Sequence, residues 1–210
     1  ISNDWSPAPT YTLKSGQSQG DVDVSPTLGN DTKCSQNDPG NENEVKEFCK
    51  TIHNALKYNE FEAVQLKLHP GTYNAHPDNL GAIKFKRINM GMKGATFSSS
   101  DVILNCNGKS CIDIDTNLKQ FAPISLRRLT FTNASASGRD NGLQEDHKYT
   151  GAVIRLVGTH DPSFTGIKIV NCVFDTSIAK TGGALFADCS KHNFFLFFQD
   201  VLFKNNVAEG

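Results

Sequence analysis

The sequence has no excess of either charge and no long apolar run. Its 210 residues include 21 lysines and arginines and 22 aspartates and glutamates, for a formal net charge of −1. We therefore expect no electrostatic attraction to nucleic acid or to an anionic membrane. The longest aromatic–aliphatic run, from Phe194 to Phe198, is too short to cross a bilayer, so no transmembrane segment is expected in this chain.

The sequence also lacks the spacing of a metal site. Its six cysteines form no CxxC pair and no Cys/His cluster of the kind that binds zinc. His147 follows Glu145 and Asp146, and His160 precedes Asp161, but all of these fall in polar segments where such side chains are usually solvated. We predict no bound metal and no cofactor.

What the sequence does contain is one hydrophobic template that recurs. The clearest copies begin at Ile124, Ile167 and Leu196, and each has apolar residues at positions i, i+2, i+5 and i+7. The pairs i, i+2 and i+5, i+7 have the period of a strand, and the two residues between them break the alternation as a corner would. We assign a fourth copy upstream, at Ile83, Phe85, Ile88 and Met90.

The copies are 41, 43 and 29 residues apart. Strand–corner–strand units that recur at about 20 to 30 residues predict an all-β fold, a parallel β-helix, in which the two longer steps each hold two coils. Stacking would place Ile124 beside Ile167 and Leu196, and Leu126 beside Ile169 and Phe198, at the ~4.8 Å spacing of strands. The alternative is a β-sandwich of several strands, which does not require the same pattern four times.

Two short motifs carry a resemblance to a known family. Gly182-Gly183-Ala184-Leu185, followed by Phe203-Lys204-Asn205-Asn206, resembles the Gly-Gly-Ala-(Ile/Leu/Val) and Phe-x-x-Asn repeats of polymorphic outer-membrane protein passengers. Other copies depart from the pattern, because Phe131 and Phe174 are followed at the third position by Ala134 and Ser177. The resemblance covers about the last third of the chain and implies a β-helix at a cell surface.

A second resemblance lies near the N-terminus. The run from Cys49-Lys-Thr-Ile52 to Pro70-Gly-Thr-Tyr73 resembles the opening of pectate-lyase-like proteins, in which a helix precedes the first strand of a right-handed, single-stranded parallel β-helix. The residue pattern agrees, since the segment Glu44–Tyr58 predicts an amphipathic helix. Its apolar stripe consists of Val45, Phe48, Cys49, Ile52, Ala55 and Leu56.

We therefore divide the chain into three segments. Residues 1–42 are predicted to form an extended arm, with an edge strand at Tyr11–Leu13 and Trp5 as its anchor. Residues 43–60 are predicted to form a capping helix, and residues 61–210 the β-helix coils. The chain stops where the pattern predicts another Gly-Gly-Ala motif, and an open coil exposes an unpaired edge. We expect the natural protein to continue.

The cysteines and two sequons favour a secreted or cell-surface location. The sequons, at Asn30 and Asn133, predict N-glycosylation. Cys34 and Cys49 would close a 15-residue loop worth roughly 3 kcal/mol. Two further cysteine pairs are considered: Cys106 and Cys111 flank a turn sequence and are predicted to pair, whereas Cys172 and Cys189 either pair, which we favour, or stay as buried thiols.

Folds of the pectate-lyase-like type often carry polysaccharide lyases and hydrolases. The best catalytic candidates are Asp113 and Asp115, which alternate with inward isoleucines, together with Arg127 or Arg128 on the next copy of the template. The alternative for the aspartates is a solvated acidic face or a local ion pair. His53, on the polar side of the predicted helix, is expected to be exposed.

Our leading hypothesis is a non-catalytic extracellular scaffold that serves adhesion, a coat or a filament. Its expected partners are surface or matrix proteins or glycans, with self-association as a further option. The competing hypothesis is a carbohydrate-active enzyme, in which Asp113, Asp115 and Arg127 or Arg128 would converge in a groove. Outward phenylalanines at Phe195 and Phe197 either form a partner interface or lie beneath a loop.

Overall fold

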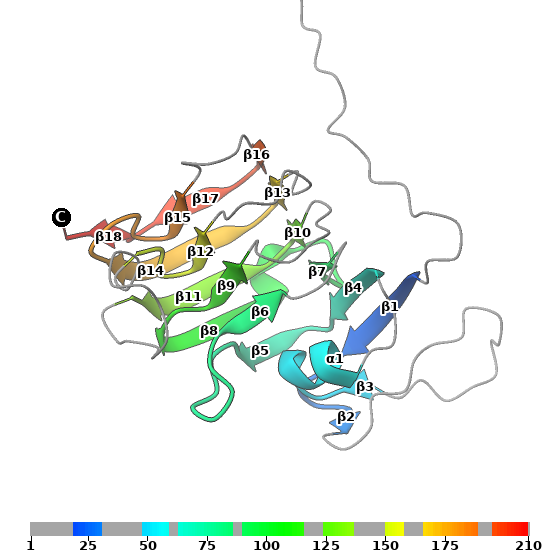
Figure 1. Ribbon diagram of the computed structural model, residues 1–210. Coiled ribbons are helices and arrows are strands. Elements are labelled where there is room, and N and C mark those ends of the chain that lie inside the picture. Colours follow the sequence, from blue (N-terminus) through cyan, green and yellow to red (C-terminus); the bar gives the residue numbers. More distant parts are fainter. Residues whose placement is uncertain are drawn as a thin grey trace, which may run out of the picture.

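The computed structural model describes residues 19–30, 48–58, 63–85, 90–115, 124–136, 150–157, 166–188 and 195–209. This part of the chain is mainly β-strand, with one short α-helix, α1 (Ile52–Tyr58), and one 3-10 turn at Ser99–Asp101. The strands form three sheets, and every strand pair is parallel (Figure 1).

The sheets, called A, B and C, differ in size. Sheet A has eight strands in the order β16 (Phe195–Gln199), β13 (Gly166–Val170), β10 (Ile124–Arg127), β7 (Met90–Gly94), β4 (Ala63–Leu68), β1 (Gln19–Val24), β3 (Phe48–Cys49) and β2 (Gly29–Asn30). Sheet B runs β17 (Leu202–Lys204), β14 (Val173–Ala179), β11 (Thr130–Ser135), β8 (Val102–Lys109) and β5 (Gly71–Asn74), with β18 (Val207–Ala208) also paired to β14. Sheet C runs β15 (Leu185–Asp188), β12 (Ile154–Val157), β9 (Ile112–Asp115) and β6 (Ile83–Phe85).

From β4 onward the chain visits the sheets in a fixed order. It passes through sheet A, then B, then C, and then returns to sheet A beside the strand it left. We call one such passage a coil. Each new coil adds one parallel strand to each sheet, so the sheets grow in step along a common axis (Figure 1).

The predicted register of the template copies is confirmed. Ile124 faces Ile167, which faces Leu196. Two residues further along, Leu126 faces Ile169, which faces Phe198. Because side chains alternate along a strand, aligning one apolar residue aligns every inward residue of that strand.

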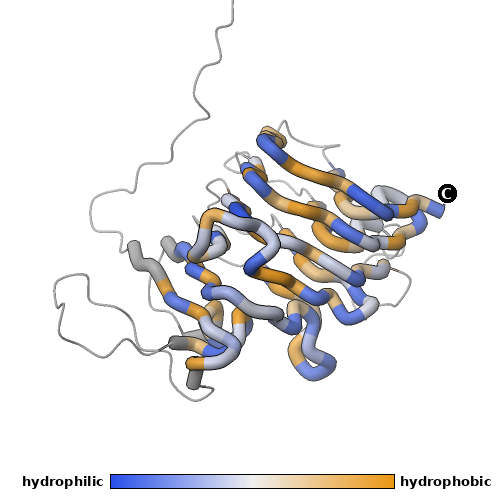
Figure 2. The backbone as a smooth tube through the Cα atoms, turned by 180° about the vertical axis from the view of Figure 1, so that it is seen from behind, coloured by the Kyte–Doolittle hydropathy of each residue, from blue (hydrophilic) through white to orange (hydrophobic). Residues whose placement is uncertain are grey.

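The apolar residues that alternate along the strands point inward and form one core. Figure 2 shows this alternation as apolar and polar segments along the same tubes. On sheet B, Phe131, Phe174 and Phe203 stack one above another, with ring centroids 5.1 and 4.9 Å apart. Stacked aromatic pairs of this kind contribute about 0.5–1.5 kcal/mol each beyond their buried area, so the ladder holds successive coils in register.

The corners between strands are built by residues in the left-handed backbone region. Between sheets A and B these are Arg128, Asn171 and Asp200, with φ of 57°, 51° and 52°. A second row within sheet B, after each stacked phenylalanine, contains Asn133, Thr176 and Asn205, with φ between 54° and 56°. Asparagine and aspartate tolerate this conformation better than most residues, and the corners explain why the alternation breaks there.

Two details of the predicted repeat are wrong. The step of 43 residues from Ile124 to Ile167 is a single coil, because β10 pairs directly with β13. The upstream copy is also misplaced: Ile83 and Phe85 belong to sheet C, and Met92 holds the position equivalent to Leu126. A strand alternation alone does not reveal which of three sheets it belongs to.

The predicted helix is shorter than expected. It begins at Ile52, where the Thr51 hydroxyl accepts a hydrogen bond from the Asn54 backbone N–H at 3.1 Å and so caps the first turn. Phe48 and Cys49, assigned to the helical stripe, form strand β3 instead, and residues 43–47 and 59–60 lie outside the described residues. Ile52 and Ala55 are buried, as the stripe predicts.

Part of the predicted arm belongs to the body of the protein. Strand β1 lies between β3 and β4 in sheet A, and its Val22 and Val24 enter the core. The edge strand predicted at Tyr11–Leu13 and the anchor predicted at Trp5 lie outside the described residues. The parallel stack therefore begins before residue 61, where the coils were expected to start.

Candidate functional site

Asp113 lies on the outward face of sheet C, in register with residues on both neighbouring strands. Lys84 of β6 faces it on one side and Arg155 of β12 on the other. The Arg155 Nε–H donates to Asp113 Oδ1 at 3.1 Å, and the two side chains are only 8% and 9% exposed. Asp113 therefore takes part in a buried ion pair, which is one of the alternatives open from the sequence.

The structure does not bring the predicted arginines to this aspartate. Arg127 lies on sheet A, where its Nε–H donates to Ser125 Oγ at 3.1 Å. The guanidinium of Arg128, at the corner that follows, lies 5.4 Å from the centre of the Phe97 ring. The backbone of Asp115 faces Val157 on sheet C, and its side chain lies outside what the structure describes.

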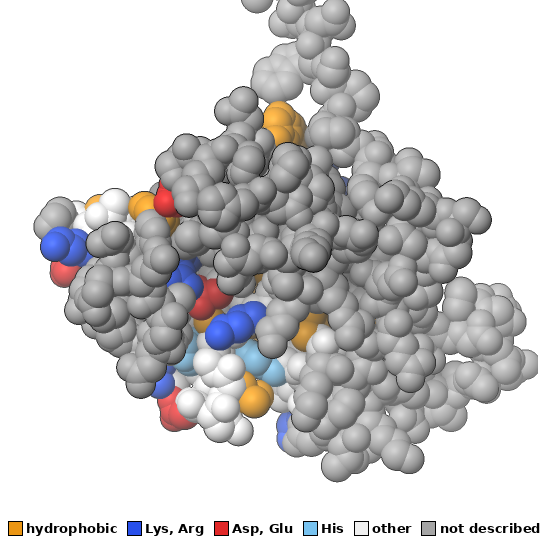
Figure 3. Space-filling model, viewed as in Figure 1, with side chains coloured by type: hydrophobic (Ala, Val, Ile, Leu, Met, Phe, Trp, Pro, Cys, Tyr) orange, Lys and Arg blue, Asp and Glu red, His pale blue; other side chains and the backbone are white. Residues whose placement is uncertain are grey.

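Arg155 is the residue that sequence reasoning missed. Its Nη1 is buried and has no hydrogen-bond partner, while its Nε is bound to Asp113. The signal was the strand alternation from Val153 to Val157, which turns Arg155 to the same face as Asp113 once the coils are aligned. Figure 3 shows basic, acidic and histidine side chains gathered over β6 and β9 on the described part of this face.

Two histidines lie close to this face, and one corrects a prediction. His53, expected to be exposed, is half-buried, and its Nε2 lies 3.1 Å from the Gly81 carbonyl oxygen, which accepts the hydrogen bond. Burial lowers the pKa of His53 below its ordinary value, and its buried Nδ1 has no partner. His76 is buried as well, with Nδ1 2.6 Å from the Ser110 carbonyl oxygen.

A second outward row, on sheet A, is also paired. Asp23 is buried, and its Oδ1 lies 2.7 Å from His69 Nε2 and 3.9 Å from Lys67 Nζ. On sheet B, Lys204 Nζ lies 3.0 Å from Asp175 Oδ2 on the preceding coil. Each of these ion pairs thus joins strands that are neighbours in a sheet.

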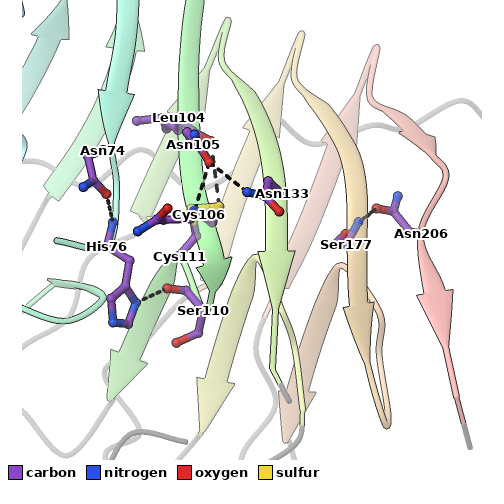
Figure 4. The surroundings of a disulfide bond; sticks show 11 residues. Asn74, His76, Leu104, Asn105, Cys106, Ser110, Cys111, Asn133, Ser177 and Asn206 are labelled. Atoms are coloured by element: carbon purple, nitrogen blue, oxygen red, sulfur yellow. Dashed lines mark hydrogen bonds between the residues drawn. A yellow bond between two sulfur atoms is a disulfide. The ribbon is translucent and has the colours of Figure 1, made fainter. Parts of the chain in front are cut away.

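The cysteines divide into three cases. Cys106 and Cys111 form a disulfide, the pairing predicted from the turn between them (Figure 4). Cys49 is disulfide-bonded and buried, while its predicted partner Cys34 lies outside the described residues. Cys172 is a free buried thiol, so the favoured Cys172–Cys189 disulfide is wrong. Cys172 takes the inward position that Leu129 holds one coil earlier. Its thiol packs in the core there as a small apolar group.

The two predicted glycosylation sites, Asn133 and Asn30, lie on different sheets. Asn133 is exposed at a corner of sheet B, and its side-chain amide donates to Asn105 Oδ1 at 3.4 Å (Figure 4). Asn30 belongs to strand β2, but its side chain is not among those described. Glycosylation at both positions stays a prediction.

The apolar residues of the last described coil are unusually exposed. Phe195, Phe198, Leu202 and Phe203 are between 41% and 52% exposed. Phe197 is covered in part by Lys168, whose Nζ lies 5.1 Å from the ring centre. Four of the nine exposed large apolar side chains among the described residues therefore lie on β16 and β17.

Comparisons with known proteins add no family. No family model matches the chain, and no curated protein or solved structure is significantly similar to it. Among the described residues, no helix is long and apolar enough to span a membrane, and no group of three or more His, Cys, Asp or Glu side chains is placed to hold a metal ion. His147 and His160, with their acidic neighbours, lie outside the described residues.

Proposed function

We propose that the chain is a non-catalytic scaffold at a cell surface or in the extracellular space, built as a right-handed, single-stranded parallel β-helix with α1 covering its N-terminal coils. The fixed order of sheets A, B and C and the stacked Phe131, Phe174 and Phe203 rings support the β-helix. The packing of Ile52 and Ala55 of α1 into the core supports the covering role. Polymorphic outer-membrane protein-type repeats and pectate-lyase-like openings remain resemblances of short motifs.

The observation that carries the scaffold proposal is the Asp113–Arg155 pair. A catalytic carboxylate must reach substrate, whereas Asp113 is buried and bound by an arginine of the next coil. The other described ion pairs also link successive coils, which is what an elongated supporting structure needs. The extracellular location is supported by the Cys106–Cys111 disulfide and by the exposure of the sequon residue Asn133. Suitable partners are surface or matrix proteins or glycans bound along the outer faces.

One observation favours the enzyme alternative enough to test it. Arg155 Nη1 has no partner although it is buried, and Lys84 lies beside Asp113 in the same row. A polysaccharide carboxylate could use such donors. This alternative requires substrate to reach a pair that is less than one tenth exposed.

The test is an assay of polysaccharide cleavage after secretion. The chain is expressed through a eukaryotic secretory pathway, and the purified protein is incubated with polyuronides and neutral polysaccharides while new reducing ends and unsaturated products are measured. The scaffold proposal expects no turnover, a glycan at Asn133 that Asn133→Gln removes, and an intact Cys106–Cys111 bond by mass spectrometry. Turnover that Asp113→Asn abolishes would establish the enzyme instead.

A further inference from the structure

Four consecutive strands of sheet A carry charge of one sign only. The strands β4, β7, β10 and β13 are neighbours in that order (Figure 1). Each contains one basic residue and no acidic residue, whereas the strands of sheets B and C carry both signs. The net charge of −1 therefore conceals a local concentration of positive charge. We call these four residues the basic ladder: Lys67, Lys93, Arg127 and Lys168.

The strand register places the basic ladder in one file on the outer face. Lys67 faces Lys93, which faces Arg127, so these three cations lie on successive strands at the ~4.8 Å strand spacing. Lys168 faces Ser125 and therefore lies diagonally from Arg127, one strand further on. The residue before each of the four in the chain is buried in the core, so strand alternation turns the basic side chains outward.

This arrangement costs stability in the free protein, because like charges directly opposite one another on neighbouring strands repel. Among the described side chains of sheet A, the only carboxylate is that of Asp23, at the N-terminal end of the file. Asp23 is buried, and its Oδ1 lies 2.7 Å from His69 Nε2 and 3.9 Å from Lys67 Nζ. No strand from β4 to β13 supplies a second carboxylate. An anionic chain laid along the file would convert the repulsion into attraction.

The basic side chains are within reach of a ligand, and two of them are held in place. Arg127 is exposed, and the other three are half-buried. The Arg127 Nε–H donates to Ser125 Oγ at 3.1 Å, and Lys168 Nζ lies 5.1 Å from the centre of the Phe197 ring. Side chains that are already ordered lose less conformational freedom when they bind a partner.

We propose that the basic ladder binds an acidic polysaccharide, a chain of sugars with carboxylate or sulfate groups, that runs across the strands of sheet A. A sugar ring is about as long as the spacing between strands, so successive acidic sugars can meet successive cations. Single-stranded nucleic acid also needs aromatic side chains on which its bases stack, and β4, β7 and β10 contain none. The proposal rests on the proposed scaffold role and names the class of glycan that the scaffold takes.

The test measures binding of fluorescein-labelled heparin and polygalacturonate to the full 210-residue chain by fluorescence anisotropy. Labelled neutral dextran and single-stranded DNA are the comparison ligands. We expect saturable binding of the acidic polysaccharides that weakens as NaCl is raised, because neutralised contacts release counterions. Dextran should not bind. Binding of heparin alone would identify sulfate as the recognised group, and binding of polygalacturonate alone would identify the carboxylate.

Two triple variants locate the binding face. Lys93→Gln, Arg127→Gln and Lys168→Gln together remove three charges of the basic ladder and are expected to weaken binding about tenfold, the loss of three ion pairs of the exposed kind. The matched variant removes three lysines on or beside sheet B and should weaken binding less than about twofold, since salt screens their charge over that distance. Circular dichroism confirms that both variants fold. The matched variant combines Lys109→Gln, Lys180→Gln and Lys204→Gln.

Chemical protection of the unaltered chain gives a test that does not depend on the folding of a variant. Lysines are acetylated with and without heparin, and each modified peptide is quantified by mass spectrometry. We expect heparin to protect Lys93 and Lys168 and to leave Lys109 and Lys180 as reactive as before.

Three results would overturn the proposal: no saturable binding of either acidic polysaccharide, equal weakening by the two triple variants, or equal protection of lysines on both sheets. Tighter binding of single-stranded DNA than of both polysaccharides would make nucleic acid the occupant instead. Any of these results leaves the non-catalytic role standing. Cleavage of bound polygalacturonate would overturn that role and leave the binding by the basic ladder intact, so the two proposals fail separately.

Discussion

Asn206 is hydrogen-bonded to Ser177, which lies 29 residues earlier but on the adjacent coil (Figure 4). The side-chain Oδ1 of Asn206 accepts from both the backbone N–H and the hydroxyl of Ser177, and its side-chain Nδ2 donates to the Phe174 carbonyl oxygen. Ser177 is completely buried, so its polar groups need partners within the protein. One side chain therefore satisfies three groups of the neighbouring coil.

Asn206→Ala should destabilise the protein by about 1–3 kcal/mol, because it leaves the buried Ser177 N–H and the Phe174 carbonyl without this partner. Urea denaturation followed by circular dichroism measures the change. Lys204→Ala is the matched control, since it removes only an exposed ion pair with Asp175, worth about 0–1 kcal/mol. Equal midpoints for Asn206→Ala and the unaltered protein would show that the Asn206 hydrogen bonds contribute nothing to stability.

The two side chains of the buried Asp113–Arg155 pair should be energetically coupled. Asp113→Ala leaves the buried Arg155 charge without its carboxylate, and Arg155→Ala removes the other half of the pair; each is expected to destabilise the protein, the former by about 3–5 kcal/mol. The double variant should lose clearly less than the sum of the two single variants. A double-mutant cycle from urea denaturation measures this coupling, and simple additivity would mean that the two side chains do not stabilise one another.

The sequence predicts the register but not the number of residues in a coil. The alignment of Ile124, Ile167 and Leu196 follows from the template, because inward residues recur at fixed distances from each corner. Coil length depends on the connections between strands, and these can lengthen without disturbing the stacked core. This is why the sequence predicts two coils for the step of 43 residues and groups Ile83 with Ile124, although Ile83 lies in sheet C and Ile124 in sheet A.

The sequence predicts the direction of the side chains at the candidate site but not their contact, again because the coil lengths are not visible in it. Alternation alone turns Asp113 outward, and it does the same for Arg155 within its own strand. The contact between them requires knowing that β9 and β12 are neighbours, which follows only when the coil lengths are known. The predicted start of the helix is wrong for a different reason. Phe48 and Cys49 fit an apolar stripe at helical spacing, but two residues also fit a short strand. Their pairing with β1 and β2 makes them a strand.

The stability of the protein should fall as the pH drops below 6.5, the ordinary pKa of histidine, in part because of His53. Burial lowers its pKa in the folded state, so between that lower pKa and 6.5 the unfolded chain binds a proton that the folded protein does not. The contribution of this group is therefore complete above pH 6.5 and is lost as the pH falls.

His53→Gln tests this dependence, since glutamine can still donate to the Gly81 carbonyl but does not titrate. Urea midpoints between pH 5 and 8 are compared for the two proteins, and the difference between them isolates the contribution of His53. We expect the variant to lose less stability than the unaltered protein on acidification. Parallel curves would show that His53 takes no part.

Cys172 should resist alkylation in the folded protein and react on unfolding. The side chain is completely buried, and burial raises the pKa of its thiol to about 11, so the thiolate that reacts is scarce at pH 8. Iodoacetamide is added at pH 8 without reductant, with and without urea at ~8 M, a concentration at which a domain of this kind unfolds. The peptide that contains Cys172 is then quantified by mass spectrometry. We expect labelling only in urea. If Cys172 were paired with Cys189, it would stay unlabelled in urea until a reductant was added, and the free thiol would be refuted.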